Sequence, residues 1–242
     1  MIWELIYRVF VDVLSIWEPY MFPSPLDVAG SLIYLVDDGS LFIALISSIQ
    51  RLALGYSLCI IIGALIGIMI IRFNYLDENL KPILLGLQSL PSICYIPFAI
   101  LWFGLSESTI LFVIIIGSAF SIATSVVSSI KNVSPLYIKA ARTMGAKGAA
   151  LYREVIFPAS LPTIITGLKQ GWSFAWRALM AGEMLVATKG LGHILMMGRD
   201  LSDISQVMAI IIIIIVLGLL FENLLFTRLE DRVREKWGLK LS

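Results

Sequence analysis

The stretch KAARTMGAKGAALYREVIFPASLP, Lys139 to Pro162, interrupts a chain that is otherwise strongly apolar. Of the 242 residues, 59% are hydrophobic and 14% are charged, whereas an ordinary soluble domain carries about 25% charged residues. The stretch itself holds four basic residues and one acid, separated mainly by alanine and glycine. Such a basic, small-residue segment indicates a link outside the bilayer, between segments that lie within it.

Apolar runs long enough to cross a bilayer lie on both sides of this link. A bilayer core of about 30 Å needs roughly 20 apolar residues in a helix. The expected spans are residues 41–71, 82–104, 108–130, 160–187 and 204–227. Residues 1–20 are expected to form a helix with a polar stripe, favoured as a further span over a helix lying in the interface. The sequence therefore predicts one all-α membrane helix bundle, residues 1–242, with five to six transmembrane helices.

The basic residues are unevenly divided between the links. Links on one side of the membrane hold twelve Lys and Arg residues, and links on the other side hold only Lys189 and Arg199. Short cytoplasmic links carry the excess of Lys and Arg. We therefore expect residues 134–158 and the C-terminus to be cytoplasmic.

Small residues and prolines within the spans leave alternatives open. Gly63 and Gly67 permit close approach of another helix, either within one subunit or between subunits. Pro91 and Pro97 bend the 82–104 run, as a simple kink or as part of a solute pathway. Cys59 and Cys94 lie in apolar runs and are expected to be buried.

Local signals divide residues 134–158 into a short helix and its continuation. Ser134 suits an N-cap, Pro135 the first helical position and Gly145 a helix stop. The helix of about ten residues is too short to cross the membrane and presents small side chains. It suits insertion into a groove on another protein, or an amphipathic connector held to anionic lipid by its basic residues.

Five sequence motifs resemble one family of transport proteins. The spacing Lys139-Ala140-Ala141-x3-Gly145-x9-Val155-x-Phe157-Pro158 is similar to the EAA signature of ABC importer permeases, Glu-Ala-Ala-x3-Gly-x9-Ile-x-Leu-Pro. The further motifs are FPSPLDV (22–28), ILWFGLSES (100–108), FPASLPTIITGL (157–168) and AGEML (181–185). Together they resemble the permeases of the nitrate, sulfonate, taurine and bicarbonate group, of the type I, binding-protein-dependent importers.

This resemblance implies a role for the short helix in the 134–158 segment. In the family this coupling helix docks into a cleft on a cytoplasmic ATPase. The coupling residues implied here are Lys139, Ala140, Ala141, Gly145 and Pro158. Lys139 replaces the family's Glu and reverses the charge presented to the ATPase.

The resemblance also implies partners and a location. The partners are an ATPase dimer that binds the ATP, an extracytoplasmic substrate-binding protein and a second permease subunit, expected to form a homodimer. The location is the cytoplasmic (inner) membrane of a prokaryote, in contact with lipid. The solute is expected to be small and anionic, such as nitrate, a sulfonate, taurine, bicarbonate or a vitamin precursor.

Charged residues inside a membrane span are candidates for function. In the 160–187 span, Trp172, Trp176, Arg177 and Glu183 form the proposed substrate pathway, with Arg177 offering an anion site. Alternatively, Arg177 pairs with a carboxylate on another helix. The Lys169 side chain is expected to extend along the helix to the cytoplasmic membrane surface. For Arg51 and Glu222 we favour a role in helix packing, or a similar extension to the membrane surface, over a role in transport.

Other function classes find little support in the residues. GAKGAA (145–150) lacks the spacing and the Lys-Ser/Thr ending of a Walker A loop. No catalytic cluster, cofactor site or metal site is expected, since the single histidine has no second ligand near it. The net charge of +1 suggests no nucleic-acid partner. The remaining alternative is a secondary transporter or channel that does not use ATP, although no inverted repeat or chain of carboxylates is visible.

Overall fold

The computed structural model describes residues 2–18 and 21–236 of the chain, and that part contains helices and no strands. The N-terminal half contains α1 (Ile2–Tyr7), η1 (Arg8–Val13), α2 (Pro25–Asp37), α3 (Ser40–Arg72), α4 (Asn74–Ser89), η2 (Ser92–Tyr95), α5 (Ile96–Phe103) and α6 (Glu107–Lys131). The C-terminal half contains α7 (Pro135–Thr143), α8 (Gly148–Leu151), η3 (Tyr152–Ile156), α9 (Phe157–Val186), α10 (Leu191–Asp200), α11 (Ile204–Phe221), η4 (Glu222–Thr227) and α12 (Arg228–Lys236). The all-α fold class is confirmed.

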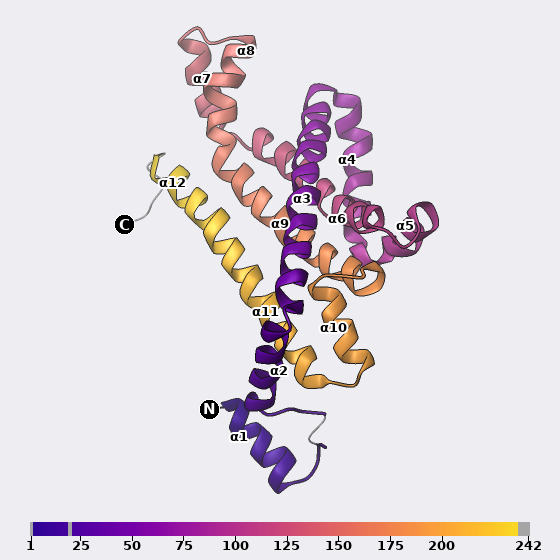
Figure 1. Cartoon of the computed structure of the whole chain (residues 1–242). Helices are drawn as coiled ribbons and strands as arrows, with labels where there is room; N and C mark the ends of the chain where they lie inside the picture. The colour runs from indigo at the N-terminus through magenta and orange to yellow at the C-terminus, as the bar shows by residue number, and fades with distance from the viewer. Residues whose placement is uncertain (1, 19–20, 237–242) are drawn as a thin grey trace.

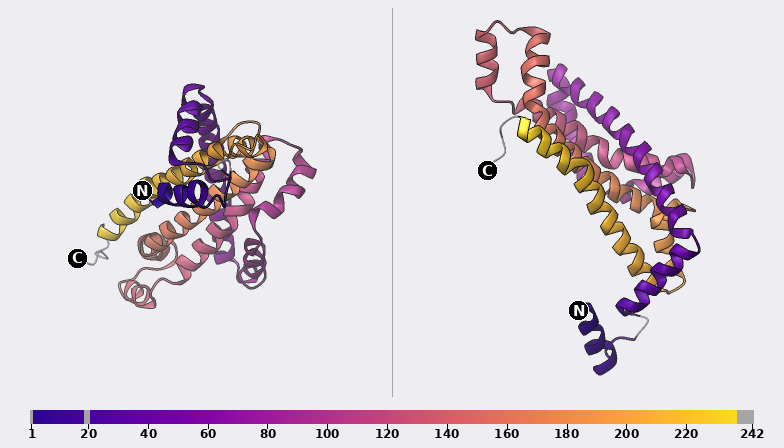
Figure 2. Two further views of the ribbon diagram at one scale, coloured as in Figure 1. Left: turned by 90° about the horizontal axis from the view of Figure 1, so that it is seen from below. Right: turned by 60° about the vertical axis from the view of Figure 1, so that its left-hand side comes forward.

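The long helices form a bundle with α7 and α8 projecting at one end and α1 lying at the other (Figure 1). The ends of α3 and α6, the start of α9 and the end of α11 are directed toward the α7–α8 end. Figure 2 shows the same projection from the side, with α12 running toward it. The chain therefore reaches the α7–α8 end three times, by way of α3, α6 and α11.

Glycines bring α3 and α9 close to α6, the most buried long helix. A Cβ on Gly63 would lie 2.7 Å from the carbonyl oxygen of Ala119, and one on Gly67 would lie 2.9 Å from the Cβ of Val126. On the other side, a Cβ on Gly171 would lie 2.6 Å from Cγ1 of Ile122. Gly63 and Gly67 therefore serve packing within one chain, which was one of the two alternatives for this pair.

Three helices of the described part are long and apolar enough to cross a membrane: α3, α6 and the continuous helix Ile204–Asp231. The pair formed by residues 74–89 and 92–103 would add a fourth, but it is bent by 99°. The run expected as one bent span, residues 82–104, is therefore divided between α4 and α5, as a broken span or a re-entrant loop. Leu90 is extended, because the ring of Pro91 disfavours helical backbone in the preceding residue. The 3-10 turn η2 that follows leaves Cys94 exposed, whereas Cys59 is buried as expected.

The N-terminal helix is shorter than expected for residues 1–20. The helical part, Ile2–Val13, has twelve residues and spans about 18 Å at 1.5 Å per residue, less than the bilayer core. The chain leaves the helix at Ser15, whose φ is 48°. The favoured interpretation as a further membrane span is therefore not supported.

Candidate functional site: the 134–158 segment and the α9–α11 cleft

The ends of α7 are set by local hydrogen bonds. The Ser134 hydroxyl accepts a hydrogen bond from the backbone N–H of Leu136 at 3.3 Å, and Pro135 occupies the first turn. At the other end, Gly145 adopts a φ of +90°, and the N–H of Ala146 donates to the carbonyl of Ala141 at 3.0 Å. A left-handed glycine with this bond is the Schellman ending of a helix. The helix is therefore closed at both ends by its own sequence.

One face of α7 is anchored and the other is exposed. Ala141, which is 8% exposed, packs in a small core with Val133, Leu151 and Ile156. The remaining surface of the helix exposes Lys139 and Ala140 together with three large apolar side chains, Leu136, Tyr137 and Met144, the last 88% exposed. None of the described carboxylates pairs with Lys139. This exposed face of α7 is an apolar surface with two cations, Lys139 and Arg142, held away from the bundle.

Pro158 stands at the junction between this segment and α9. It occupies the first turn of α9, directly after the widened π-helical turn η3. Because proline has no backbone N–H, it cannot continue the hydrogen-bond ladder of the preceding turn. The junction is thus a change of helix geometry within an otherwise continuous helical connection.

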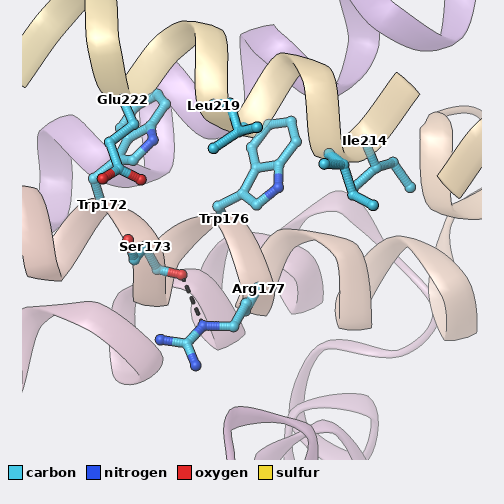
Figure 3. A pocket seen from close by; sticks show the side chains of 9 residues that line it. Trp172, Ser173, Trp176, Arg177, Ile214, Leu219 and Glu222 are labelled. Carbon is cyan, nitrogen blue, oxygen red and sulfur yellow. Dashed lines mark hydrogen bonds between the residues drawn. The ribbon is translucent and has the colours of Figure 1, made fainter. Parts of the chain in front are cut away.

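A cleft of about 380 Å³ separates α9 from α11 (Figure 3). Trp172 and Trp176 are directed toward α11, whereas Arg177 extends to the other side of α9. The lining residues labelled in the figure are Trp172, Ser173, Trp176 and Arg177 on α9, and Ile214, Leu219 and Glu222 on α11 and η4. Three of the four residues predicted for the pathway therefore line one cleft.

Trp172 belongs mainly to the core. Its ring contacts Tyr56 edge-on at 5.1 Å between ring centres, and Phe226 at 5.8 Å. Only 7% of the residue is exposed, so most of its area stabilises the junction of α3, α9 and η4. Trp176 is the more exposed wall of the cleft.

Arg177 is exposed and has no carboxylate partner among the described residues. Its Nε donates to the carbonyl of Ser173 at 3.0 Å, and its guanidinium lies 4.8 Å from the centre of the Phe174 ring. The alternative prediction, an ion pair with another helix, is therefore not seen within the described part of this chain. The remaining N–H groups of Arg177 are available to a ligand.

Lys169 and Glu222 form an interhelical pair that the sequence did not predict. Lys169 Nζ lies 3.0 Å from Glu222 Oε1, linking α9 to η4. The two residues are 53 positions apart, so only the packing of the helices brings them together.

Glu183 lies away from the cleft, in an ion cluster formed by Ser48, Arg51, Glu107 and Glu183, of which Glu107 is exposed and the other three are buried. Its carboxylate is 0% exposed and receives hydrogen bonds from Ser48 Oγ at 2.7 Å and Arg51 Nη1 at 2.8 Å. A third hydrogen bond comes from the backbone N–H of Gly192 at 3.1 Å. Glu183 is therefore not a wall of the α9–α11 cleft, because its hydrogen-bonding capacity is used within the bundle.

Arg51 connects the members of this ion cluster. It contacts Glu107 through Nε and Nη2, at 2.5 and 2.6 Å, and donates from Nη1 to the carbonyl of Lys189. These contacts join α3, α6, α9 and the link before α10. A buried charge is tolerated when it is paired and hydrogen-bonded. The only available signal in the sequence was the presence of charge in two apolar runs, Arg51 in residues 41–71 and Glu183 in residues 160–187.

Residues 19–235 match the family model described as "Binding-protein-dependent transport system inner membrane component". The chain belongs to this family. A putative ABC transporter permease of Methanocaldococcus jannaschii is 33% identical to this chain, over 91% of this chain and 88% of the relative. A putative aliphatic sulfonates transport permease of Bacillus subtilis is 31% identical to this chain, over 93% of this chain and 80% of the relative.

A solved structure supports the fold. The permease resembles a chain of the inward-facing MetNI methionine ABC transporter with a TM-score of 0.64 and 20% identity, over 77% of the permease and 92% of that chain. The resemblance to the sulfonate, taurine and nitrate group is confirmed, since permeases named for all three are among the matched relatives.

Family membership decides between the function classes. The chain is the membrane-spanning subunit of an ATP-driven ABC importer, integral to the inner membrane, and it is a transport subunit rather than an enzyme. The family works with an ATPase and a substrate-binding protein as partners. The alternative of a transporter that does not use ATP is therefore excluded.

Proposed function

We propose that the permease receives the motion of its ATPase through the exposed face of α7 and moves a small anionic solute into the cytoplasm. The observation that carries this proposal is the construction of the 134–158 segment. A closed helix projects beyond the bundle, exposes Leu136, Tyr137, Ala140 and Met144, and is anchored only by the face around Ala141. A helix that lays an apolar face into a groove is a recurring mode of protein recognition.

The helices attached to this segment suit the transmission of force. The segment connects the end of α6 to the start of α9, and these two helices pack along one another. The contact is tight, since a Cβ on Gly167 would lie 2.4 Å from the Cβ of Ser125. A displacement of α7 would therefore move α6 and α9 together rather than bend a flexible link.

The proposed orientation places the α7–α8 end in the cytoplasm. The basic residues support it, because Lys131, Lys139, Arg142, Lys147 and Arg153 gather in or beside this segment. The proposed assembly contains two copies of this permease and two ATPases. The second permease copy is needed because the α9–α11 cleft is open on one side of this bundle and one chain does not enclose it. Sulfonates are the leading class of solute, because one of the relatives is named for their transport.

Replacing Ala140 by Trp tests the docking role of α7. Ala140 is exposed and points about 100° away from the anchored Ala141, so Ala140→Trp should leave the fold intact while obstructing a fitted groove. Overpacking costs about 1–3 kcal/mol, so we expect the ATPase retained on the purified permease to fall about tenfold. The measurement is co-purification at matched concentrations, followed by ATP hydrolysis in liposomes.

Ala29→Trp, an exposed alanine of α2 near the opposite end of the bundle, is the matched control and should retain the ATPase. Equal retention by the two variants would contradict docking through α7.

A further inference from the structure

A second cleft opens between α9 and α10, beside the one already described. Its volume is about 440 Å³, and its walls include Trp176, Arg177, Met180 and Met184 of α9 with Met196 and Arg199 of α10. Trp176, Arg177 and Ile214 line both clefts. The two clefts therefore meet at Arg177.

The charges in this second cleft are positive and unequal. No carboxylate lines it within the described part of the chain. Arg177 has no acidic partner there, whereas Arg199 donates from Nε and Nη2 to Asp200 at 3.0 and 2.6 Å. The Arg199 and Asp200 side chains are 61% and 62% exposed, so their pair is weak and easily exchanged.

The remaining wall of the cleft is apolar and adaptable. Three methionines, Met180, Met184 and Met196, line it with Trp176, and methionine side chains adjust to irregular shapes. Cavities of about 300–1,000 Å³ with a few polar groups suit small organic ligands. A guanidinium binds an oxyanion through two parallel hydrogen bonds, and a ligand with an apolar body would also cover the methionines.

We propose that this second cleft binds an oxyanion carried on an apolar body, of the alkanesulfonate class, with Arg177 as the main anchor and Arg199 as a second. The inference rests on the proposed transport of anionic solutes and specifies their class. Arg177 stands nine residues before the end of α9, about 14 Å along the axis. In the proposed orientation the cleft therefore lies in the extracytoplasmic half, where an arriving solute enters.

The test uses the full-length permease with its ATPase bound, in phosphatidylcholine nanodiscs. The probe is 1-hexanesulfonate, titrated against tryptophan fluorescence. Trp176→Phe assigns the signal to the two clefts that meet at Arg177, and the Arg199 variants below assign it to the second of them, because Arg199 lines only that one. Two control ligands each carry one half of the probe: potassium nitrate supplies an oxyanion without an alkyl chain, and 1-hexanol supplies the alkyl chain without a charge. We expect 1-hexanesulfonate to bind at least about tenfold more tightly than either, since each control lacks one of the two contributions. Equal binding of nitrate and 1-hexanesulfonate would overturn the proposal.

Three variants separate the roles of the charges. Arg177→Gln should weaken binding of 1-hexanesulfonate about tenfold, and Arg199→Gln should weaken it less. Asp200→Asn releases Arg199 and should tighten binding about threefold, a gain that a purely structural role of Arg199 does not produce. Arg228→Gln, an exposed arginine of α12 that lines neither cleft, is the control and should change nothing. Unchanged binding in Arg177→Gln, or weaker binding in Asp200→Asn, would refute the assignment.

A lipid headgroup shares the oxyanion chemistry, and a second set of nanodiscs distinguishes it. If added phosphatidylglycerol competes fully with 1-hexanesulfonate, the cleft is a lipid site and the proposal fails; persistence of binding supports a solute site. The outcome is also independent of the docking of α7, because Ala140→Trp should impair ATPase retention without altering the binding of 1-hexanesulfonate.

Discussion

At the scale of single residues, the charges inside the apolar helices divide into paired and available groups. Arg51 and Glu183 satisfy one another in the ion cluster, and Lys169 pairs with Glu222. Arg177 alone among these helix charges contacts only a backbone carbonyl and an aromatic ring. Both Glu183 and Arg177 could be identified as unusual from the sequence. Their different roles could not, because the partner of Glu183 lies 132 positions away.

Removing the charge of Glu183 should destabilise the permease strongly. Glu183→Gln leaves Arg51 buried with a reduced set of acceptors, and breaking a buried ion pair costs about 3–5 kcal/mol. Glu107→Gln is the comparison, because the Glu107 side chain is 62% exposed and its loss should cost about 1 kcal/mol or less. The measurement is the free energy of unfolding of the purified permease in mixed micelles. Similar losses for the two variants would show that Glu183 is not the more buried of the two partners of Arg51.

At the scale of elements, α6 organises the bundle because α3 and α9 approach it through glycines. The small-xxx-small pattern of Gly63 and Gly67 predicted a close helix contact, and the contact is present. The pattern carries no information on which helix fills the space. Likewise, Pro91 predicted an interruption, but the 99° bend depends on how α4 and α5 pack against the rest of the bundle.

Adding one methyl group at two glycines should therefore have opposite effects. At Gly63 a Cβ would lie 2.7 Å from a backbone oxygen, which cannot move without shifting α6. Gly63→Ala should cost about 1–3 kcal/mol. At Gly86, in α4, a Cβ meets nothing within 4 Å, so Gly86→Ala should stabilise by about 0.5–1 kcal/mol. The melting temperatures of the two variants check the prediction, and a shift of the same sign in both would contradict it.

At the scale of the whole molecule, the two ends of the bundle differ in charge and in shape. The α7–α8 end carries the basic 134–158 segment, and the opposite end carries α1, the start of α2 and the turn between α10 and α11 (Figure 1). The proposed orientation assigns these ends to the cytoplasm and to the outside. It follows that a probe unable to cross the membrane should reach them from opposite sides.

Single cysteines provide that measurement. In a Cys94→Ser background, which removes the exposed native thiol, Met144→Cys should react with an impermeant maleimide only in inside-out vesicles. Leu201→Cys, 69% exposed between α10 and α11, should react only in intact cells. Labelling of both positions from one side would rule out the proposed orientation.

The sequence alone determined the family, the helical membrane architecture and the limits of α7, because each depends on residues that are neighbours along the chain. Apolar runs report on the bilayer, Ser134 and Gly145 close a helix through local hydrogen bonds, and the EAA-like motif is contiguous. Only the tertiary structure decided that Glu183 is enclosed with Arg51, that Trp172 belongs to the core, and that Arg177 and Arg199 line the same cleft. These outcomes depend on which helices lie side by side, and side-chain pairing over more than a hundred residues leaves no local pattern in the chain.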